Sequence, residues 1–217
     1  MSRRHVTKLV VAALLAQLFV FTDVAGALTP PGPPQSNPAV VRGNTWYLRR
    51  ELPAVVVDQR FVYGDPGDVP GMGDWDGNGT DTPGVVRNGV WHLRNSNSTG
   101  IGEISFAYGN PGDFPVVGDW DGNGTDTPGV VRGPSIEGYE WFLRNSNSTG
   151  TGIFPGFTVL AAGTTFLAGD WDGDRIASAG VFDDRTAGWA MRNAHTIGYP
   201  DMTFTYGNPG DRALSWK

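Results

Sequence analysis

The sequence predicts an all-β fold built from repeated units of four short antiparallel strands, and three observations support this. Residues 73–87 and 118–132 both read GDWDGNGTDTPGVVR, and residues 169–182 carry a diverged third copy, GDWDGDRIASAGVF. The first aspartates of successive copies are 45 and 51 residues apart, a period typical of units that stack on one another. Within the repeat, strand and turn patterns follow one another without a helix signal.

The unit that starts at Asp74 shows the expected strands in order. Residues 84–87 (GVVR) and 90–94 (VWHLR) flank Asn88-Gly89, a strong hairpin signal because both central positions of that turn need positive φ. A polar loop follows, and residues 104–108 alternate apolar and small side chains, as a half-buried strand does. With the strand that leads into the next copy, this makes four strands per unit, which is typical of a β-propeller blade.

Marker residues keep one register through the chain. A tryptophan begins the same strand of each unit and an arginine follows it three residues later (Trp46, Trp91, Trp141, Trp189; Arg49, Arg94, Arg144, Arg192). In three units a tyrosine closes the outer strand before a turn that reads YGDPGD or YGNPGD. The third unit is longer because it inserts residues 134–139, which we expect to form a loop in place of a tight hairpin.

The units are expected at about residues 39–68, 69–113, 114–164 and 165–211. The first supplies three strands and lacks the innermost one, whereas residues 213–216 (ALSW) stand where such a strand belongs. We therefore expect a propeller of about four four-stranded blades, closed by the C-terminal strand as a monomer. A dimer that completes the ring, or a fragment of a longer array, is the competing interpretation, because RALSWK matches the FPVVGDW template poorly.

Residues 1–27 have the pattern of a secretory signal peptide. A basic start precedes an apolar run at 9–21 and a small-x-small sequence that ends at Ala27. Because the run is shorter than the roughly 20 residues that span a bilayer, secretion is favoured over a membrane anchor. Residues 28–38 are proline-rich and predict an extended linker, which leaves 39–217 as the repeat domain. We expect a secreted protein, extracellular or cell-wall associated, with no membrane contact after cleavage.

The aspartate loops are candidate calcium sites. In DWDGNGTDT, acidic or amide side chains occupy positions 1, 3 and 5, and a glycine at position 6 permits the sharp turn. Hard oxygen ligands at this spacing suit Ca²⁺. The Thr80 carbonyl at position 7 is the expected backbone ligand. Asp81 or Thr82 could complete the shell. The candidate ligands are Asp74, Asp76, Asn78, Thr80 and Asp81 in the first copy, Asp119, Asp121, Asn123, Thr125 and Asp126 in the second, and Asp170, Asp172 and Asp174 in the third.

The alternative is a metal-free turn in which Asp and Asn cap their own backbone amides. Calcium is favoured because carboxylates held this close together repel one another unless a cation joins them. The third loop is weaker, since Arg175 replaces the turn glycine and Ala177 replaces the acid at position 8.

The GDWDG…TDTPGVVR segments, the W-x-L-R-N strand and the YGNPGD turn together resemble FG-GAP and VCBS-type β-propeller repeats of secreted actinobacterial proteins. The resemblance covers about residues 39–211. It implies a propeller with calcium-binding loops between the first and second strands of a blade. In that family the last ligand is usually an Asp at position 9, where this chain has Thr82, Thr127 and Ser178.

A non-catalytic function is predicted. The chain has no cysteine, and its net charge of −6 argues against a nucleic-acid partner. Motifs of nucleophilic or zinc hydrolases are missing. His92 varies between units, and His195 lies in a polar connection without a repeated partner. The loop tryptophans are read as core wedges, with sugar stacking by Trp75 and Trp120 as the alternative.

The sequence therefore predicts a secreted calcium-binding propeller that acts as a binding or adhesion module for an extracellular glycan or protein. A secreted hydrolase, or an accessory module of one, is the alternative.

Overall fold

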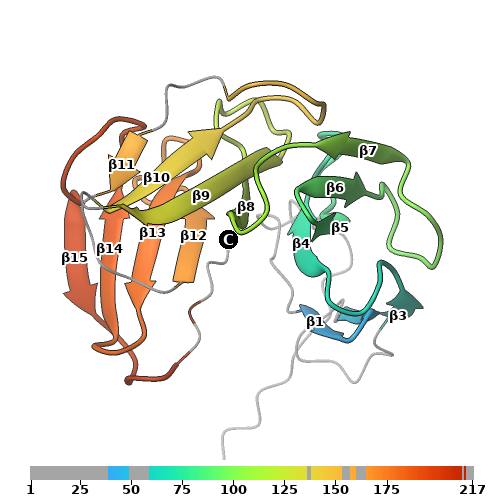
Figure 1. The fold of residues 1–217 in the computed structure, drawn as a ribbon, viewed down its shortest axis with the longest axis horizontal. Helices are drawn as coiled ribbons and strands as arrows, with labels where there is room; N and C mark the ends of the chain where they lie inside the picture. The colour runs from blue at the N-terminus through green and yellow to red at the C-terminus, as the bar shows by residue number, and fades with distance from the viewer. Residues whose placement is uncertain are drawn as a thin grey trace, which may run out of the picture. The chain divides into compact units, whose positions relative to one another are not determined.

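Four antiparallel sheets make up the described part of the chain (Figure 1). The computed structural model describes residues 39–48, 59–135, 138–152, 157–159, 165–211 and 213, all within one compact unit, Gln35–Lys217. These ranges hold strands and turns and no helix, so the all-β prediction is confirmed for them. Accordingly, none of the described residues form a helix that could cross a membrane.

Each sheet consists of strands that are consecutive in the sequence and adjacent in space. Sheet A contains β1 (Ala39–Arg42), β2 (Thr45–Leu48) and β3 (Gln59–Val62). Sheet B contains β4 (Val69–Gly73), β5 (Thr82–Arg87), β6 (Val90–Leu93) and β7 (Ile104–Ala107). Sheet C contains β8 (Phe114–Gly118), β9 (Thr127–Ser135), β10 (Gly138–Leu143) and β11 (Phe157–Val159). Sheet D contains β12 (Thr165–Gly169), β13 (Ser178–Asp183), β14 (Gly188–Arg192) and β15 (Met202–Thr205).

The Asn88-Gly89 hairpin forms as the sequence predicts. Arg87 pairs with Val90 across a two-residue turn, and the φ angles of Asn88 and Gly89 are 51° and 78°. Positive φ at both central positions twists the turn in the same sense as the strands that it joins. The hairpin fixes the register of β5 and β6.

The expectation of a loop at residues 134–139 is wrong. These residues instead lengthen the hairpin, because β9 continues to Ser135, β10 starts at Gly138, and these two residues pair. The register shifts between Gly138 and Glu140, so the longer strands are accommodated by an irregularity in the ladder. The physical reason is that the inserted residues can extend backbone pairing that already exists.

Aromatic pairs hold the outer half of three sheets together. A tryptophan of the third strand position faces a phenylalanine of the outer strand, and the two rings lie nearly parallel (Trp46 and Phe61 at 7°, Trp91 and Phe106 at 2°, Trp189 and Phe204 at 9°). Each indole N–H also donates to the carbonyl of the tyrosine just after the outer strand (Tyr63, Tyr108, Tyr206; 3.0 Å each). Cross-strand pairs of this kind are a main source of sheet stability.

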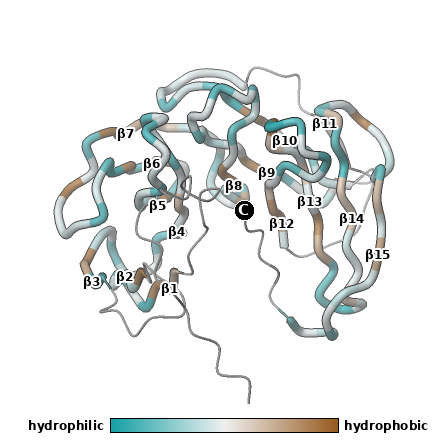
Figure 2. Tube along the Cα trace, turned by 180° about the vertical axis from the view of Figure 1, so that it is seen from behind, coloured by the Kyte–Doolittle hydropathy of each residue, from teal (hydrophilic) through white to brown (hydrophobic). Residues whose placement is uncertain are grey.

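Consecutive sheets share hydrophobic cores. Val85 of sheet B packs with the aromatic residues of sheet A, Val130 of sheet C with those of sheet B, and Val181 of sheet D with those of sheet C. The first strands of sheets B, C and D, namely β4, β8 and β12, are also in contact in series. In Figure 2 short hydrophobic and hydrophilic segments alternate along the strands, as expected for strands that bury one face.

Several predictions concern residues outside the described ranges. The signal peptide (1–27) and the linker (28–38) lie there entirely. Of the expected closing strand at 213–216, only Ala213 is described, and it is buried with Leu167 and Phe182 of sheet D.

Candidate functional site

The first aspartate loop wraps around the Asp74 carboxylate. Asp74 Oδ1 accepts a hydrogen bond from the amide of Asn78 at 3.0 Å, and Oδ2 accepts one from Gly79 at 2.6 Å. Asp76 makes a longer bond to the Asn78 amide at 3.3 Å, and Asn78 Oδ1 accepts from the Thr80 amide at 2.9 Å. The side chains at positions 1, 3 and 5 therefore face the same short stretch of backbone.

The second loop has the same geometry. Asp119 accepts from the amides of Asn123 at 3.0 Å and Gly124 at 2.8 Å, and Asn123 Oδ1 accepts from Thr125 at 2.8 Å. Asp121 again makes only a 3.3 Å contact to the Asn123 amide. In both loops the position-1 aspartate is buried, whereas the position-3 aspartate is exposed.

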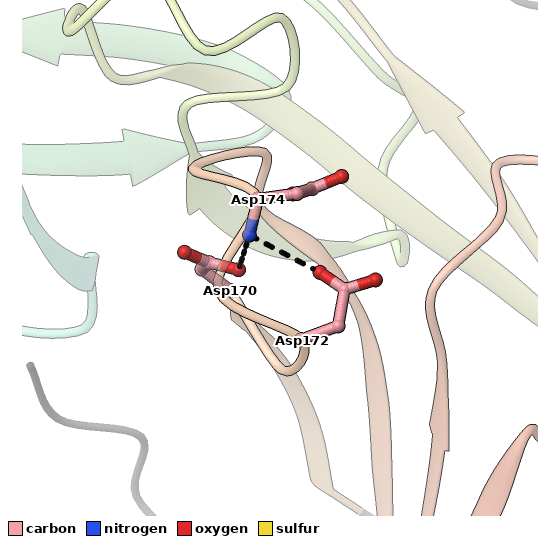
Figure 3. Close-up of side chains that lie close together, drawn as sticks. All are labelled: Asp170, Asp172 and Asp174. Atoms are coloured by element: carbon pink, nitrogen blue, oxygen red, sulfur yellow. Dashed lines mark hydrogen bonds between the residues drawn. The ribbon is translucent and has the colours of Figure 1, made fainter.

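The third loop keeps this geometry despite its altered sequence (Figure 3). Asp170 Oδ1 accepts from Asp174 at 3.0 Å, Oδ2 accepts from Arg175 at 2.9 Å, and Asp172 lies 3.4 Å from the Asp174 amide. Arg175 takes the conformation of the glycine that it replaces, with φ at 75°, which costs about 1 kcal/mol for a residue with a Cβ. Asp170, Asp172 and Asp174 each bring one carboxylate oxygen within 4.8 Å of the others.

This donor set fits a hard divalent cation. The loops have the self-capped hydrogen bonds of the metal-free alternative, but a carboxylate offers about four acceptor positions. Each Asp74 oxygen accepts one amide bond, so lone pairs remain for an ion. Only oxygen donors are present at these positions, which are the ligands that hard divalent cations take and soft metals do not.

The residue at position 8 links one aspartate loop to the loop of the preceding sheet. Asp126 Oδ2 accepts from the Asp74 amide at 3.0 Å, and the Asp126 amide donates to the Asp74 carbonyl at 2.8 Å. In the next pair of sheets, the Ala177 amide donates to the Asp119 carbonyl at 2.7 Å. Asp126, a candidate ligand in its own loop, thus binds the backbone of Asp74 in the preceding loop.

A second set of repeated polar residues follows the third strand position. We name residues 94–102, 144–152 and 192–200 the arginine loops, because the guanidinium of the first residue binds the whole loop. In the second of them, Arg144 donates to the carbonyls of Ser148 at 2.6 Å and Thr151 at 2.7 Å, and to Ser148 Oγ at 2.8 Å. Arg94 and Arg192 make the same three bonds in their loops.

Two of these three arginines also contact an acidic side chain: Glu103 lies 3.0 Å from Arg94, and Asp201 lies 3.7 Å from Arg192. The shared role is nevertheless to satisfy loop carbonyls. The sequence signal for it was the recurring R-N-x-x-[ST] pattern.

The expectation that His195 has no repeated partner is wrong. His195 stands three residues after Arg192, as Asn97 and Asn147 stand after their arginines. Its Nε2 is 2.9 Å from the carbonyl of Ala177, at position 8 of the third aspartate loop. The asparagines bind the corresponding carbonyls (Asn97 to Asp81 at 3.1 Å; Asn147 to Asp126 at 3.2 Å).

The surroundings of His195 disfavour its charged form. Burial lowers the pKa of His195, and the bond to the Ala177 carbonyl and the charge of Asp174 oppose this only in part. Its ring meets the Trp120 ring edge-on, at 6.2 Å between centroids. His195 is therefore part of the packing between sheets C and D.

The loop tryptophans belong to the core. Trp75 and Trp120 are buried, and their indole N–H groups donate to the carbonyls of Thr82 at 3.0 Å and Thr127 at 3.1 Å. Neither ring face is free for a ligand, so the sugar-stacking alternative is wrong for these two residues. Burial of a large ring wedges each aspartate loop against its own sheet.

A cavity of about 280 Å³ lies at the junction of sheets A and B, lined by Tyr63, Arg87, His92 and Ile101 among others. Burial, assisted by the charge of Glu103, raises the pKa of Tyr63 to about 12, and its hydroxyl has no hydrogen-bond partner among the described residues. Arg87 is already neutralised by Asp68 at 2.7 Å. The cavity therefore offers no free cationic group from that arginine.

No family model, curated protein or solved structure matches this chain. The resemblance to FG-GAP and VCBS-type repeats stays a prediction from the sequence motifs.

Proposed function

We propose that this protein is a secreted, non-catalytic β-propeller that is stabilised by calcium and acts as an extracellular binding or adhesion module. One observation carries the proposal. The repeated polar residues lie where consecutive sheets meet, so the chemistry shared by the repeats serves the scaffold and is distributed along it. An active site would instead concentrate such residues at one place.

The propeller arrangement is supported by the order of contacts. Sheets A, B, C and D pack in sequence order through shared cores, and β4, β8 and β12 touch in series. Stacked four-stranded sheets with adjacent first strands are the building principle of a propeller. The resemblance to FG-GAP repeats points the same way.

Calcium would be held by the oxygens at positions 1, 3 and 5 of each aspartate loop, together with the carbonyl at position 7. The ion would supply positive charge to a group of carboxylates and so remove their mutual repulsion. Because Asp74 also anchors the neighbouring Asp126, a bound ion would stiffen the junction between sheets B and C.

Isothermal titration of the EDTA-treated protein with CaCl₂ tests this part of the proposal. We expect saturable binding to at least the two near-identical loops and weaker binding of Mg²⁺, which tolerates irregular oxygen shells poorly. Absence of heat at millimolar Ca²⁺, in a protein that is folded by circular dichroism, would remove calcium from the proposal.

The binding role is tested with glycan and extracellular-matrix arrays. Because Trp75 and Trp120 are buried, recognition would use other surfaces, and variants of these two residues are uninformative. We expect a specific ligand class to be retained above background in calcium and released in EDTA.

One observation favours the hydrolase alternative. Ser105 Oγ on β7 lies 3.1 Å from His92 Nδ1 on β6, the spacing of a nucleophile and a general base. A screen of esterase, glycosidase and phosphatase substrates distinguishes the two functions. Turnover that is lost in both Ser105→Ala and His92→Gln would establish the enzyme, and our proposal expects none.

A further inference from the structure

The outer face of sheet D exposes side chains that sheets A and B bury. Phe204 and Tyr206 are 40% and 74% exposed. The residues at the same repeat positions, Phe61 and Tyr63 in sheet A and Phe106 and Tyr108 in sheet B, are all buried. Met202 and Tyr199 add to the exposed apolar surface of sheet D. An exposed group of large apolar side chains of this kind marks an interaction surface.

The interior junctions show what covers this face elsewhere. On sheet A, Val85 of sheet B packs against the aromatic residues, and Thr99 Oγ1 of the next arginine loop accepts from the Val62 amide at 3.0 Å. On sheet B, Val130 of sheet C packs in the same way, and Thr149 Oγ1 accepts from Ala107 at 3.3 Å. The occupant of the face is thus the following sheet.

Sheet A has the complementary exposed residue at the other end of the series. Val40 in β1 stands at the repeat position of Val85, Val130 and Val181. Those three valines are buried against the preceding sheet, whereas Val40 is 58% exposed. In the single chain Val40 and Tyr206 are exposed together, so sheet A of the same chain does not cover sheet D.

We propose that a second copy of this chain docks on sheet D through the β1 face of its sheet A. The contact continues the packing that joins A to B, B to C and C to D within one chain. Two copies related by a twofold axis would form two such junctions and leave neither end exposed. The proposal rests on the observed packing of the sheets and does not require calcium or a ligand.

Light scattering after size exclusion, on the full chain purified in EDTA and again in calcium, gives the first test. We expect a mass of two chains in both conditions. A monomer at micromolar concentration would overturn the proposal, and so would a mass that grows without limit, because the closed pair saturates both faces.

Single charged substitutions identify the faces. Val40→Glu and Tyr206→Glu alter exposed side chains, so each is expected to fold and to be monomeric. Thr80→Glu is the matched control, since Thr80 is exposed and belongs to neither sheet A nor sheet D, and it should stay dimeric. In an equimolar mixture of the Val40→Glu and Tyr206→Glu proteins, sheet A of the second variant and sheet D of the first are both unaltered. One junction can therefore form, and the mixture should show the mass of a dimer. If Val40→Glu is still dimeric, sheet D faces meet each other and the proposed occupant is wrong.

Cross-linking separates a second copy from closure within one chain. The protein has no cysteine, so the double variant Val40→Cys, Tyr206→Cys carries the only two thiols. Mild oxidation should give a covalent dimer on a non-reducing gel. A disulfide within a monomer would show that sheet A of the same chain reaches sheet D, and would overturn the proposal.

Discussion

At the scale of the single residue, position 8 of the aspartate loop shows how one side chain joins two sheets. Asp126 binds Asp74 through both its carboxylate and its amide. The corresponding bond to Asp119 comes from the Ala177 backbone, and alanine has no carboxylate to add to it. At this point the junction between sheets B and C therefore has one more hydrogen bond than the junction between sheets C and D.

Asp126→Ala is expected to lower the free energy of unfolding by about 1–2 kcal/mol, because it leaves the partly buried Asp74 amide without its acceptor. Urea unfolding in EDTA measures this without a contribution from metal. Thr80→Ala is the matched control, since the Thr80 side chain is exposed and should change stability by no more than about 0.5 kcal/mol. Equal stability of both variants would show that the carboxylate bond contributes nothing.

We expect His195 to make the junction between sheets C and D sensitive to pH. Its pKa is lowered from 6.5 in the folded chain, so the unfolded chain binds the proton more readily. Stability should therefore fall as the pH drops from about 6.5 to the folded-state pKa, below which the loss is complete. His195→Asn restores the residue used in sheets B and C and should remove this component. The measurement is the free energy of urea unfolding of the unaltered chain and of His195→Asn, from pH 7.5 to 5. The same pH dependence in both proteins would show that His195 is not the residue responsible.

At the scale of the element, the arginine loops explain how long polar connections stay ordered. The loop carbonyls point inward and have no strand partner, so the guanidinium supplies donors in a fixed fork. The loops in turn reach the preceding sheet, as Asn147 does by donating to the Trp75 carbonyl at 3.1 Å. Loop order and sheet packing are therefore coupled.

Arg144→Lys keeps the charge and loses the fork, since one ammonium cannot reach two carbonyls and a hydroxyl in those directions. We expect a loss of about 1–3 kcal/mol in unfolding free energy and faster hydrogen exchange at residues 145–152. Arg175→Lys is the control, because the Arg175 side chain is exposed. Unchanged exchange in the Arg144→Lys loop would refute the role of the fork.

The local sequence patterns predicted most of the strands. They did not predict which residues of one repeat contact residues of another. The Asn88-Gly89 turn and the pairing of tryptophan strands with outer strands follow from residues close in sequence. The Asp126 to Asp74 bond joins residues 52 apart, and nothing within one loop distinguishes that role from a ligand role. The equivalence of His195 to Asn147 could not be seen from the sequence because the two side chains differ, although each contacts the carbonyl at position 8 of its own aspartate loop, Ala177 for His195 and Asp126 for Asn147. The insertion at 134–139 was predicted to be a loop because it replaces the tight hairpin of the other units, and the sequence does not show that the inserted residues pair with each other.

The whole molecule is a series of similar sheets, and we expect its stability to depend on the junctions between them. The junctions of sheets B with C and C with D combine a shared apolar core, an arginine loop and a contact between two aspartate loops, whereas the junction of sheets A and B combines a core and an arginine loop. Repeat proteins of this kind gain stability from neighbouring units more than from any single unit. A ligand that tightens the aspartate loops should therefore stabilise the molecule as a whole.

The central claim is that calcium performs this role, and thermal unfolding in excess CaCl₂ against EDTA tests it most directly. We expect a higher Tm in calcium, since a ligand at about 100 times its Kd adds about 2.7 kcal/mol per site. The double variant Asp76→Asn, Asp121→Asn is the sharpest control. Both side chains are exposed and make only 3.3 Å contacts, so its Tm in EDTA should match that of the unaltered chain while its calcium shift is reduced. Superimposable melting curves of the unaltered chain in calcium and in EDTA would contradict the account.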